Sequence, residues 1–181
     1  DDGVFPRTIT HFGGVTTIAA PPQRVVVIAT GQIDSAIAAG VAGLIGVVFS
    51  YLGDVWTADE NGQNIQRLTV NRARDAYARF SPDGKWIAFS SDRNGNQDIF
   101  LMPSGGGAAK QLTSHSSDDL MLGWTPDSKA VLFSSNRGED FMPQLYLVST
   151  EGGMPRKAGT DMGVQASYSP DGQKLAYNQK S

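Results

Sequence analysis

The stretch Phe80-Ser81-Pro82-Asp83-Gly84 decides the fold, because it returns twice along the chain. It recurs as Trp124-Thr125-Pro126-Asp127-Ser128 and as Tyr168-Ser169-Pro170-Asp171-Gly172. The interval is 44 residues both times, since 124 − 80 = 44 and 168 − 124 = 44. An internal repeat of about 40 to 50 residues is typical of β-propeller blades, each built from four short strands.

Two further pairs of segments share this interval. Leu68-Thr69 returns as Leu112-Thr113, and Phe-Ser-Ser-Asp-Arg at residues 89–93 returns as Phe-Ser-Ser-Asn-Arg at residues 133–137. Three registers that agree on one period indicate a true repeat.

The chemistry within one period predicts the strands of a blade. Pro82 fixes its own φ, and Asp83-Gly84 supplies a tight turn after the first strand. Residues 85–90 are apolar on both faces, as expected of a strand packed between two blades, and Asn94-Gly95 gives the next turn. Residues 98–102 and 108–113 are the predicted third and fourth strands.

The same order predicts strands elsewhere in the chain. The first blade has three predicted strands, the next two have four each and the last has two, which makes 13 strands. Outside the second blade, the clearest lie at residues 47–51, 54–58, 65–69, 129–135, 144–149, 164–168 and 173–178. The predicted fold is therefore all-β, a partial propeller of about three four-stranded antiparallel blades at residues 47–181.

These motifs resemble the propeller repeats of the TolB and tricorn-protease families. The shared features are the aromatic-Ser-Pro-Asp-Gly turn at residues 80–84, the strand ending in Ser-Asp-Arg at 89–93, the glycine turn at 105–107 and the Leu-Thr strand at 111–113. The resemblance covers roughly residues 49–181 and implies a propeller. Its motifs are structural and imply little about activity.

Residues 1–46 differ from the rest. Residues 7–11, 14–18 and 22–27 resemble the start of a periplasmic siderophore-binding protein, in which short strands precede a helix, and residues 33–41 are predicted as that helix. This small β/α segment lacks the two lobes of a complete binding protein of that kind. We interpret residues 46–50 as a junction between unrelated segments, in a recombined, designed or truncated chain.

The composition argues against several kinds of partner and site. The chain of 181 residues has a net charge of −3 and no basic cluster, which disfavours nucleic acid as a partner. It has no cysteine, so no disulfide or thiolate site is expected. Its most apolar stretch, residues 36–49, is interrupted by glycines and is too short to predict a membrane span.

Three blades do not close a ring, because propellers typically have about four to eight. The N-terminal segment could complete a blade, a second chain could complete the ring, or the chain could be part of a larger propeller. We favour self-association, so we expect a homo-oligomer or a protein or peptide partner.

The two histidines, His11 and His115, are candidates for a hydrolytic triad. His115 lies close in sequence to serines and aspartates, but in a loop without a nucleophile motif, and the alternative is a polar loop that caps a strand. We favour the loop. The residues weighed with His115 are Ser114, Ser116, Asp118 and Asp119.

The charged residues at repeat positions have two possible roles. Asp92, Arg93, Asn136 and Arg137 could face a ligand, or could form turns and an ion pair that braces neighbouring strands, which we favour. Asp98 and Asp140 are candidate metal ligands, but no loop has calcium-binding spacing, which disfavours that role.

Aromatic residues and the N-terminal arginines complete the candidates. Each tryptophan lies in a predicted strand and is expected in the blade core. The two arginines would bind an anionic ligand only if the second lobe of a siderophore-binding protein were present. The tryptophans are Trp56, Trp86 and Trp124, the arginines Arg7 and Arg24, and the glycine pairs Gly13-Gly14 and Gly152-Gly153 are predicted turns.

The sequence therefore predicts a non-enzymatic propeller scaffold or protein-interaction module, with no catalytic, cofactor-binding or metal-binding residues. Two alternatives stay open: the non-catalytic propeller portion of a tricorn-like peptidase, and a periplasmic iron-siderophore binding protein. The resemblances alone imply a periplasmic or extracellular location.

Overall fold

The computed structural model describes residues 7–11, 14–18, 36–37, 46–59, 62–138, 142–159, 163–169 and 171–178, with backbone only up to residue 37. Every regular element in these ranges is a β-strand, which confirms the all-β prediction. None of these residues belongs to a helix that is long and apolar enough to cross a membrane.

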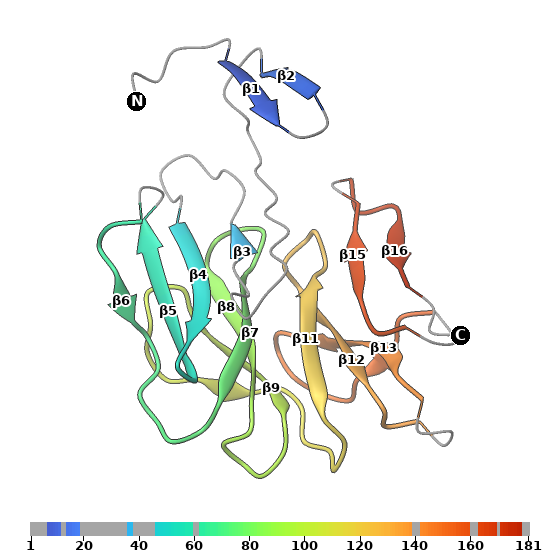
Figure 1. The fold of residues 1–181 in the computed structure, drawn as a ribbon. Coiled ribbons are helices and arrows are strands. Elements are labelled where there is room, and N and C mark those ends of the chain that lie inside the picture. The colour runs from blue at the N-terminus through green and yellow to red at the C-terminus, as the bar shows by residue number, and fades with distance from the viewer. Residues whose placement is uncertain are drawn as a thin grey trace.

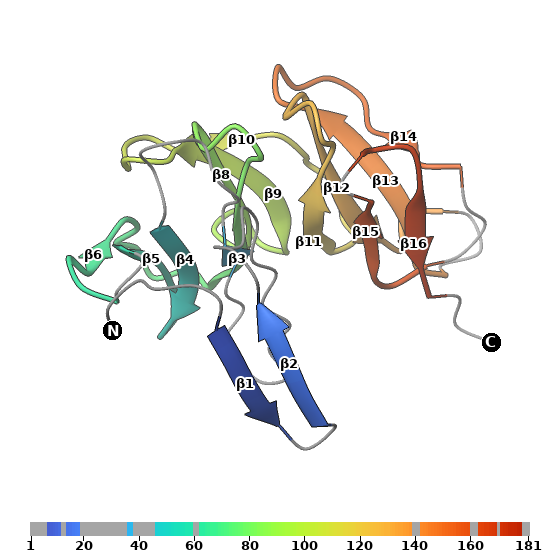
Figure 2. The ribbon, with the colours of Figure 1, turned by 90° about the horizontal axis from the view of Figure 1, so that it is seen from above.

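Apart from an N-terminal two-stranded sheet, the described strands form three four-stranded antiparallel sheets and one two-stranded sheet, here called blades 1 to 4. Figure 2 shows the blades around an arc, with β3, β11 and β15 on its inner side, and β7 is the matching edge strand of the second blade. Blade 1 contains β3 (Ala36–Ile37), β4 (Gly46–Tyr51), β5 (Asp54–Asp59) and β6 (Gln66–Arg67). Blade 2 contains β7 (Asp75–Phe80), β8 (Trp86–Ser91), β9 (Asp98–Pro103) and β10 (Lys110–Gln111). Blade 3 contains β11 (Asp119–Trp124), β12 (Ala130–Ser135), β13 (Gln144–Ser149) and β14 (Arg156–Lys157), and blade 4 contains β15 (Ala166–Tyr168) and β16 (Leu175–Tyr177).

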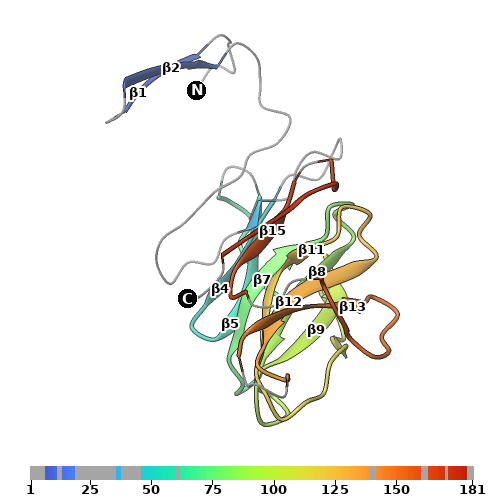
Figure 3. The ribbon, with the colours of Figure 1, turned by 90° about the vertical axis from the view of Figure 1, so that its right-hand side faces the viewer.

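The two strands predicted near the N-terminus are present as a hairpin. β1 (Arg7–His11) pairs with β2 (Gly14–Ile18) in antiparallel register. The hairpin lies apart from the blades (Figures 1 and 3). The strand predicted at residues 22–27 lies outside the described residues.

The helix predicted at residues 33–41 is wrong at the two residues that are described. Ala36 and Ile37 form strand β3 and pair with Val48 and Val47 of β4. The pairing supplies partners for the inner edge of β4, whose backbone groups would otherwise lack them, and such non-local pairing overrides local helix preference. Blade 1 therefore has four strands rather than the predicted three.

The repeated turn is held by its aspartate. The Asp83 carboxylate accepts hydrogen bonds from Ser81 Oγ at 2.6 Å and from the Lys85 backbone at 3.2 Å. Burial opposes ionisation of Asp83, but these hydrogen bonds outweigh it and lower the pKa. The third turn residue is left-handed in all three copies, with φ of 71° at Gly84, 61° at Ser128 and 72° at Gly172.

The hydrophobic core lies between the blades, in three layers. Ile87 and Phe89 of β8 pack toward blade 1, whereas Ala88 between them packs toward blade 3. Leu145 and Leu147 of β13 pack toward blade 4. Both faces of the middle strands are thus buried, which confirms the two-faced apolar pattern of the predicted second strand and places the polar side chains at the loop ends.

Candidate functional site

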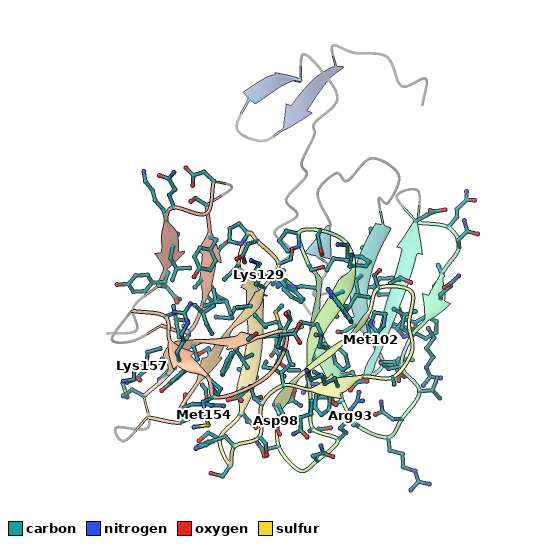
Figure 4. The ribbon with its side chains drawn as sticks, turned by 180° about the vertical axis from the view of Figure 1, so that it is seen from behind. Arg93, Asp98, Met102, Lys129, Met154 and Lys157 are labelled. Carbon is teal, nitrogen blue, oxygen red and sulfur yellow. The ribbon has the colours of Figure 1, made fainter. Side chains whose placement is uncertain are left out.

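One face of the arc carries the loops that enter each blade and the loops that join its second and third strands; we call it the entry face. The two kinds of loop are tied together at each blade. The backbone of Asp119 donates to Gln97 O at 2.7 Å, and that of Asp75 donates to Gly53 O at 2.7 Å. In Figure 4, Arg93 and Asp98 lie at this lower edge, and Lys129, after the Pro-Asp turn, lies at the upper edge.

Two hollows open on the entry face, one at blade 2 and one at blade 3. The hollow at blade 3 measures about 430 Å³ and is lined mainly by neutral hydroxyl, amide and apolar groups, among them Ser117, Asn136 and Val164. The hollow at blade 2 measures about 480 Å³ and is lined by charged groups, among them Arg72 and Asp92.

The two hollows are related by the repeat. Ala73 and Asp92 line the hollow at blade 2. Ser117 and Asn136, which lie 44 residues after them, line the hollow at blade 3. The hollows therefore share two positions of the repeat, while the rest of their lining differs between the blades.

The repeated arginines are bound to buried aspartates. Arg93 Nη2 lies 3.0 Å from Asp75 Oδ1, and its Nε donates to Ser91 Oγ at 2.9 Å. Its guanidinium lies over the rings of Phe89 and Phe100, 5.3 and 4.4 Å from their centroids. Arg137 pairs with Asp119 in the same way over Phe133 and Tyr146. This is the geometry of an ion pair that braces neighbouring strands of one blade.

A second repeated cluster anchors the outermost strand. Thr113 Oγ1 accepts from the Ile99 backbone at 2.9 Å and donates to Asp98 Oδ1 at 3.2 Å. In blade 1, Thr69 Oγ1 makes the matching contacts to Val55 and Asp54 at 2.9 and 3.4 Å. The Leu-Thr motif of the sequence therefore has a structural role.

The two aspartates of this cluster differ in their charged neighbours. Asp54 pairs with the guanidinium of Arg67. In place of that cation, Asp98 accepts a hydrogen bond from a neutral amide, Gln111 Nε2, at 3.0 Å, besides those from Thr113 Oγ1 and the His115 backbone. Burial raises the pKa of Asp98, and the negative charge of Asp119 raises it further.

His115 lies in the loop that enters blade 3. Its Nδ1 accepts from the Ser117 backbone at 3.0 Å, which is the one hydrogen bond that its imidazole makes to the described residues. One period earlier, Asn71 Oδ1 accepts from the Ala73 backbone at 2.7 Å, and Asn71 Nδ2 also donates to Asp75 Oδ2 at 3.0 Å. His115 makes no matching bond, and Asp119 Oδ1 is buried without a hydrogen bond from the described residues.

Sequence reasoning missed Asp75, Asp54 and Asn71, although the 44-residue register relates Asp75 to Asp119 and Asn71 to His115. Among the described residues there is no group of three His, Asp or Glu side chains that could hold a metal ion. The candidates Asp140, Arg24 and Gly13, and the side chains of Arg7 and His11, lie outside what the structure describes.

The three tryptophans have different environments. Trp124 is buried, as predicted, and its Nε1 donates to Arg79 O at 3.2 Å. Trp56 is half-buried against Tyr51. The core prediction is wrong for Trp86, which is 36% exposed because it begins β8 directly after the Pro-Asp-Gly turn, where the blade meets solvent.

Four consecutive antiparallel blades around an arc, with cores between the blades, define a β-propeller domain. The family of tricorn protease N-terminal β-propeller domains matches residues 45–181, so the chain belongs to this family.

Relatives agree with this assignment. The chain is 34% identical over 64 residues to tricorn protease homolog 1 of Streptomyces coelicolor, covering 35% of this chain and 6% of that protein. It is 41% identical over 51 residues to the Tol-Pal system protein TolB of Syntrophus aciditrophicus, covering 28% and 11%. The solved structure of putative TolB from Agrobacterium tumefaciens superposes with a TM-score of 0.64 at 22% identity, over 74% of this chain and 50% of that one. The chain thus spans only a small part of the curated relatives that it matches.

Proposed function

We propose that this chain is a non-enzymatic propeller module that holds segments of other proteins or peptides on its entry face. The observation that carries the proposal is the pair of hollows, about 430 and 480 Å³, at related positions of consecutive blades. Their volumes lie within the range found for ligand pockets. Their placement on successive blades suits an extended ligand that crosses from one blade to the next.

The contacts on this face support a role without catalysis. The buried carboxylates of Asp75 and Asp119 hold arginines, and the imidazole of His115 accepts from a backbone amide. A hydrolytic site would need a histidine that bonds both a nucleophile and a carboxylate. These groups instead fix the loops that shape the hollows.

The test is titration of the chain into fluorescein-labelled unstructured peptides, followed by anisotropy. Ala73→Trp and Ser117→Trp each fill one hollow and should weaken binding, whereas Lys129→Trp, on the opposite face, should leave binding unchanged. Absence of binding to every peptide, or equal loss in all three variants, would contradict the proposal. Release of new amino termini from the peptides by the chain alone would show that it is an enzyme.

A second candidate is the non-catalytic propeller portion of a tricorn-like peptidase, which the family match favours. In this role the entry face would hold peptides for a catalytic part elsewhere. An excess of the chain should then slow peptide cleavage by tricorn protease homolog 1, because the two would compete for the same peptides. An unchanged rate with peptides that bind the chain would count against this candidate.

We also infer self-association and a periplasmic or extracellular location. The open ends of the arc support the first, and the likeness to the Tol-Pal system protein TolB supports the second. Cell fractionation with an antibody against the chain tests the location, and recovery in the cytoplasmic fraction would contradict it.

A further inference from the structure

Exposed apolar and cationic side chains gather where blade 1 meets blade 2 on the entry face. Leu52 is 83% exposed and Val70 is 76% exposed. Arg72 and Arg74 are also exposed, and their guanidinium groups make no ion pair or hydrogen bond to any residue that the structure describes. We call Leu52, Val70, Arg72 and Arg74 the blade 1 edge patch.

The turn and the loop that carry this patch are in contact. The Asp75 backbone donates to Gly53 O at 2.7 Å, and a Cβ atom added to Gly53 would lie 3.5 Å from Ala73 O and 3.8 Å from Arg74 Cα. Val70 directly follows Thr69, whose hydroxyl bonds the Val55 backbone of the same hairpin. Arg72 also lines the hollow of about 480 Å³, so the patch and the hollow form one continuous surface.

The fold does not require this chemistry. One period later, Val70, Arg72 and Arg74 are replaced by Ser114, Ser116 and Asp118. The later loop nevertheless makes the same backbone contact, since Asp119 N donates to Gln97 O at the same 2.7 Å. A loop of the same architecture is thus built with polar and acidic residues in blade 3 and with apolar and basic residues in blade 2, which points to a use of the latter beyond folding.

Leu52 adds an independent sign of function. It has φ of 51° and is followed by Gly53 with φ of 84°, the combination of a type I′ turn, in which asparagine is favoured at the first position. A left-handed leucine is strained, and at 83% exposure it recovers little by packing. Retained strain at an exposed apolar tip is characteristic of a contact site.

We propose that the blade 1 edge patch docks a partner segment that alternates apolar and acidic side chains, with the apolar groups on Leu52 and Val70 and the carboxylates on Arg72 and Arg74. This deepens the proposed function and rests on it. The Asp92 carboxylate lies beside the patch, where it accepts from the Arg74 backbone at 2.7 Å, but the two arginines outnumber it. Because the net charge of the chain is −3, this surface has a sign opposite to that of the molecule, which favours acidic ligands.

The test compares three short labelled peptides by anisotropy: alternating Leu and Glu, alternating Leu and Lys, and alternating Ser and Glu. The Leu-Glu peptide should bind most tightly of the three, and added salt should weaken its binding. The triple variant Val70→Ser, Arg72→Ser, Arg74→Asp carries the residues of the next repeat, so its loop is expected to fold. It should bind the Leu-Glu peptide at least about tenfold more weakly, as expected for loss of paired charges and an apolar anchor.

Leu52→Asn separates docking from folding. It should raise the midpoint of thermal unfolding, because asparagine tolerates the left-handed turn conformation. It should nevertheless weaken binding of the Leu-Glu peptide, because the apolar contact is lost. The double variant Lys85→Ser, Lys174→Asp on the opposite face is the control and should bind like the parent chain. If other peptides bind but the Leu-Glu peptide does not, or if it binds the triple variant equally well, this inference is wrong while the proposed function stands. If no peptide of any kind binds, the proposed function has failed and this inference with it.

Discussion

At the scale of the residue, the neighbours of each repeated aspartate decide how many hydrogen bonds its carboxylate accepts. Asp75 has Arg93 on one carboxylate oxygen and Asn71 on the other. Asp119 has Arg137 on one oxygen, while the other is buried without a hydrogen bond from the described residues. An asparagine amide can accept and donate at once, whereas His115 uses Nδ1 to accept, so one substitution in the repeat leaves one acceptor unsatisfied.

His115→Asn should therefore stabilise the chain by about 1 kcal/mol, the usual net worth of a hydrogen bond to a buried group. The new amide would accept from Ser117 N and donate to Asp119, as Asn71 does for Ala73 and Asp75. Urea denaturation measures the change. His115→Ala is the control, because alanine can neither accept nor donate, and equal stability of the two variants would refute the explanation.

The contrast between Asp54 and Asp98 gives a pH prediction. The pKa of Asp98 is raised above 3.8 by burial and then by the charge of Asp119. Protonation is thus easier in the folded chain, so this group favours folding fully below pH 3.8, and that contribution is lost as the pH rises through the raised pKa.

Gln111→Arg should lower the pKa of Asp98, because it supplies the guanidinium that Arg67 gives Asp54. Titration of the Asp98 carboxyl carbon by NMR measures the shift, and stability near neutral pH should rise with it. Gln111→Glu is the opposite control and should raise the pKa further. An unchanged pKa of Asp98 in both variants would show that the partner at position 111 does not set its value.

At the scale of the element, the middle strands carry the links between blades. Ser90 Oγ of β8 accepts from the Met121 backbone at 2.8 Å and donates to Asp119 O at 3.0 Å. Ser134 Oγ of β12 donates to Gly163 O at 3.1 Å. Each serine stands at the end of an apolar strand, where its buried hydroxyl satisfies a backbone group in, or just before, the inner strand of the neighbouring blade.

Ser90→Ala should cost about 1 to 3 kcal/mol, because it leaves a buried backbone donor at Met121 without its partner. Ser134→Ala should cost less, since only a carbonyl loses a donor. Urea denaturation followed by tryptophan fluorescence compares the two. If Ser134→Ala proves the more harmful, the bond to Met121 is not what makes Ser90 important.

At the scale of the whole molecule, the arc consists of three complete blades and the two strands of blade 4. The strand edge of β16 and the outer side of blade 1 have no neighbouring sheet among the described strands. Unpaired strand edges favour association with another chain.

Size exclusion with light scattering should therefore give a mass near twice the 19.3 kDa of one chain. Two copies related by a two-fold axis would bring their open ends together. A mass that stays near 19.3 kDa over a wide concentration range would contradict self-association and direct attention to partners of other sequence.

The sequence by itself determined the fold class, the period and most strand positions. The strand predicted at residues 144–149 is observed as Gln144–Ser149, and the one at 98–102 as Asp98–Pro103. Turn residues act locally and the apolar pattern follows strand geometry, so both can be seen in one dimension. The fourth strands were predicted too long, because only Lys110–Gln111 of residues 108–113 meets the curving edge of β9.

The tertiary structure decided the pairing of β3 with β4, the exposure of Trp86, the unsatisfied oxygen of Asp119 and the two hollows on the entry face. The strand pairing and the two hollows depend on which segments of the chain meet in space. Contacts of this kind are set by the packing of whole blades, and neither turn chemistry nor strand period encodes which neighbour a side chain will find there.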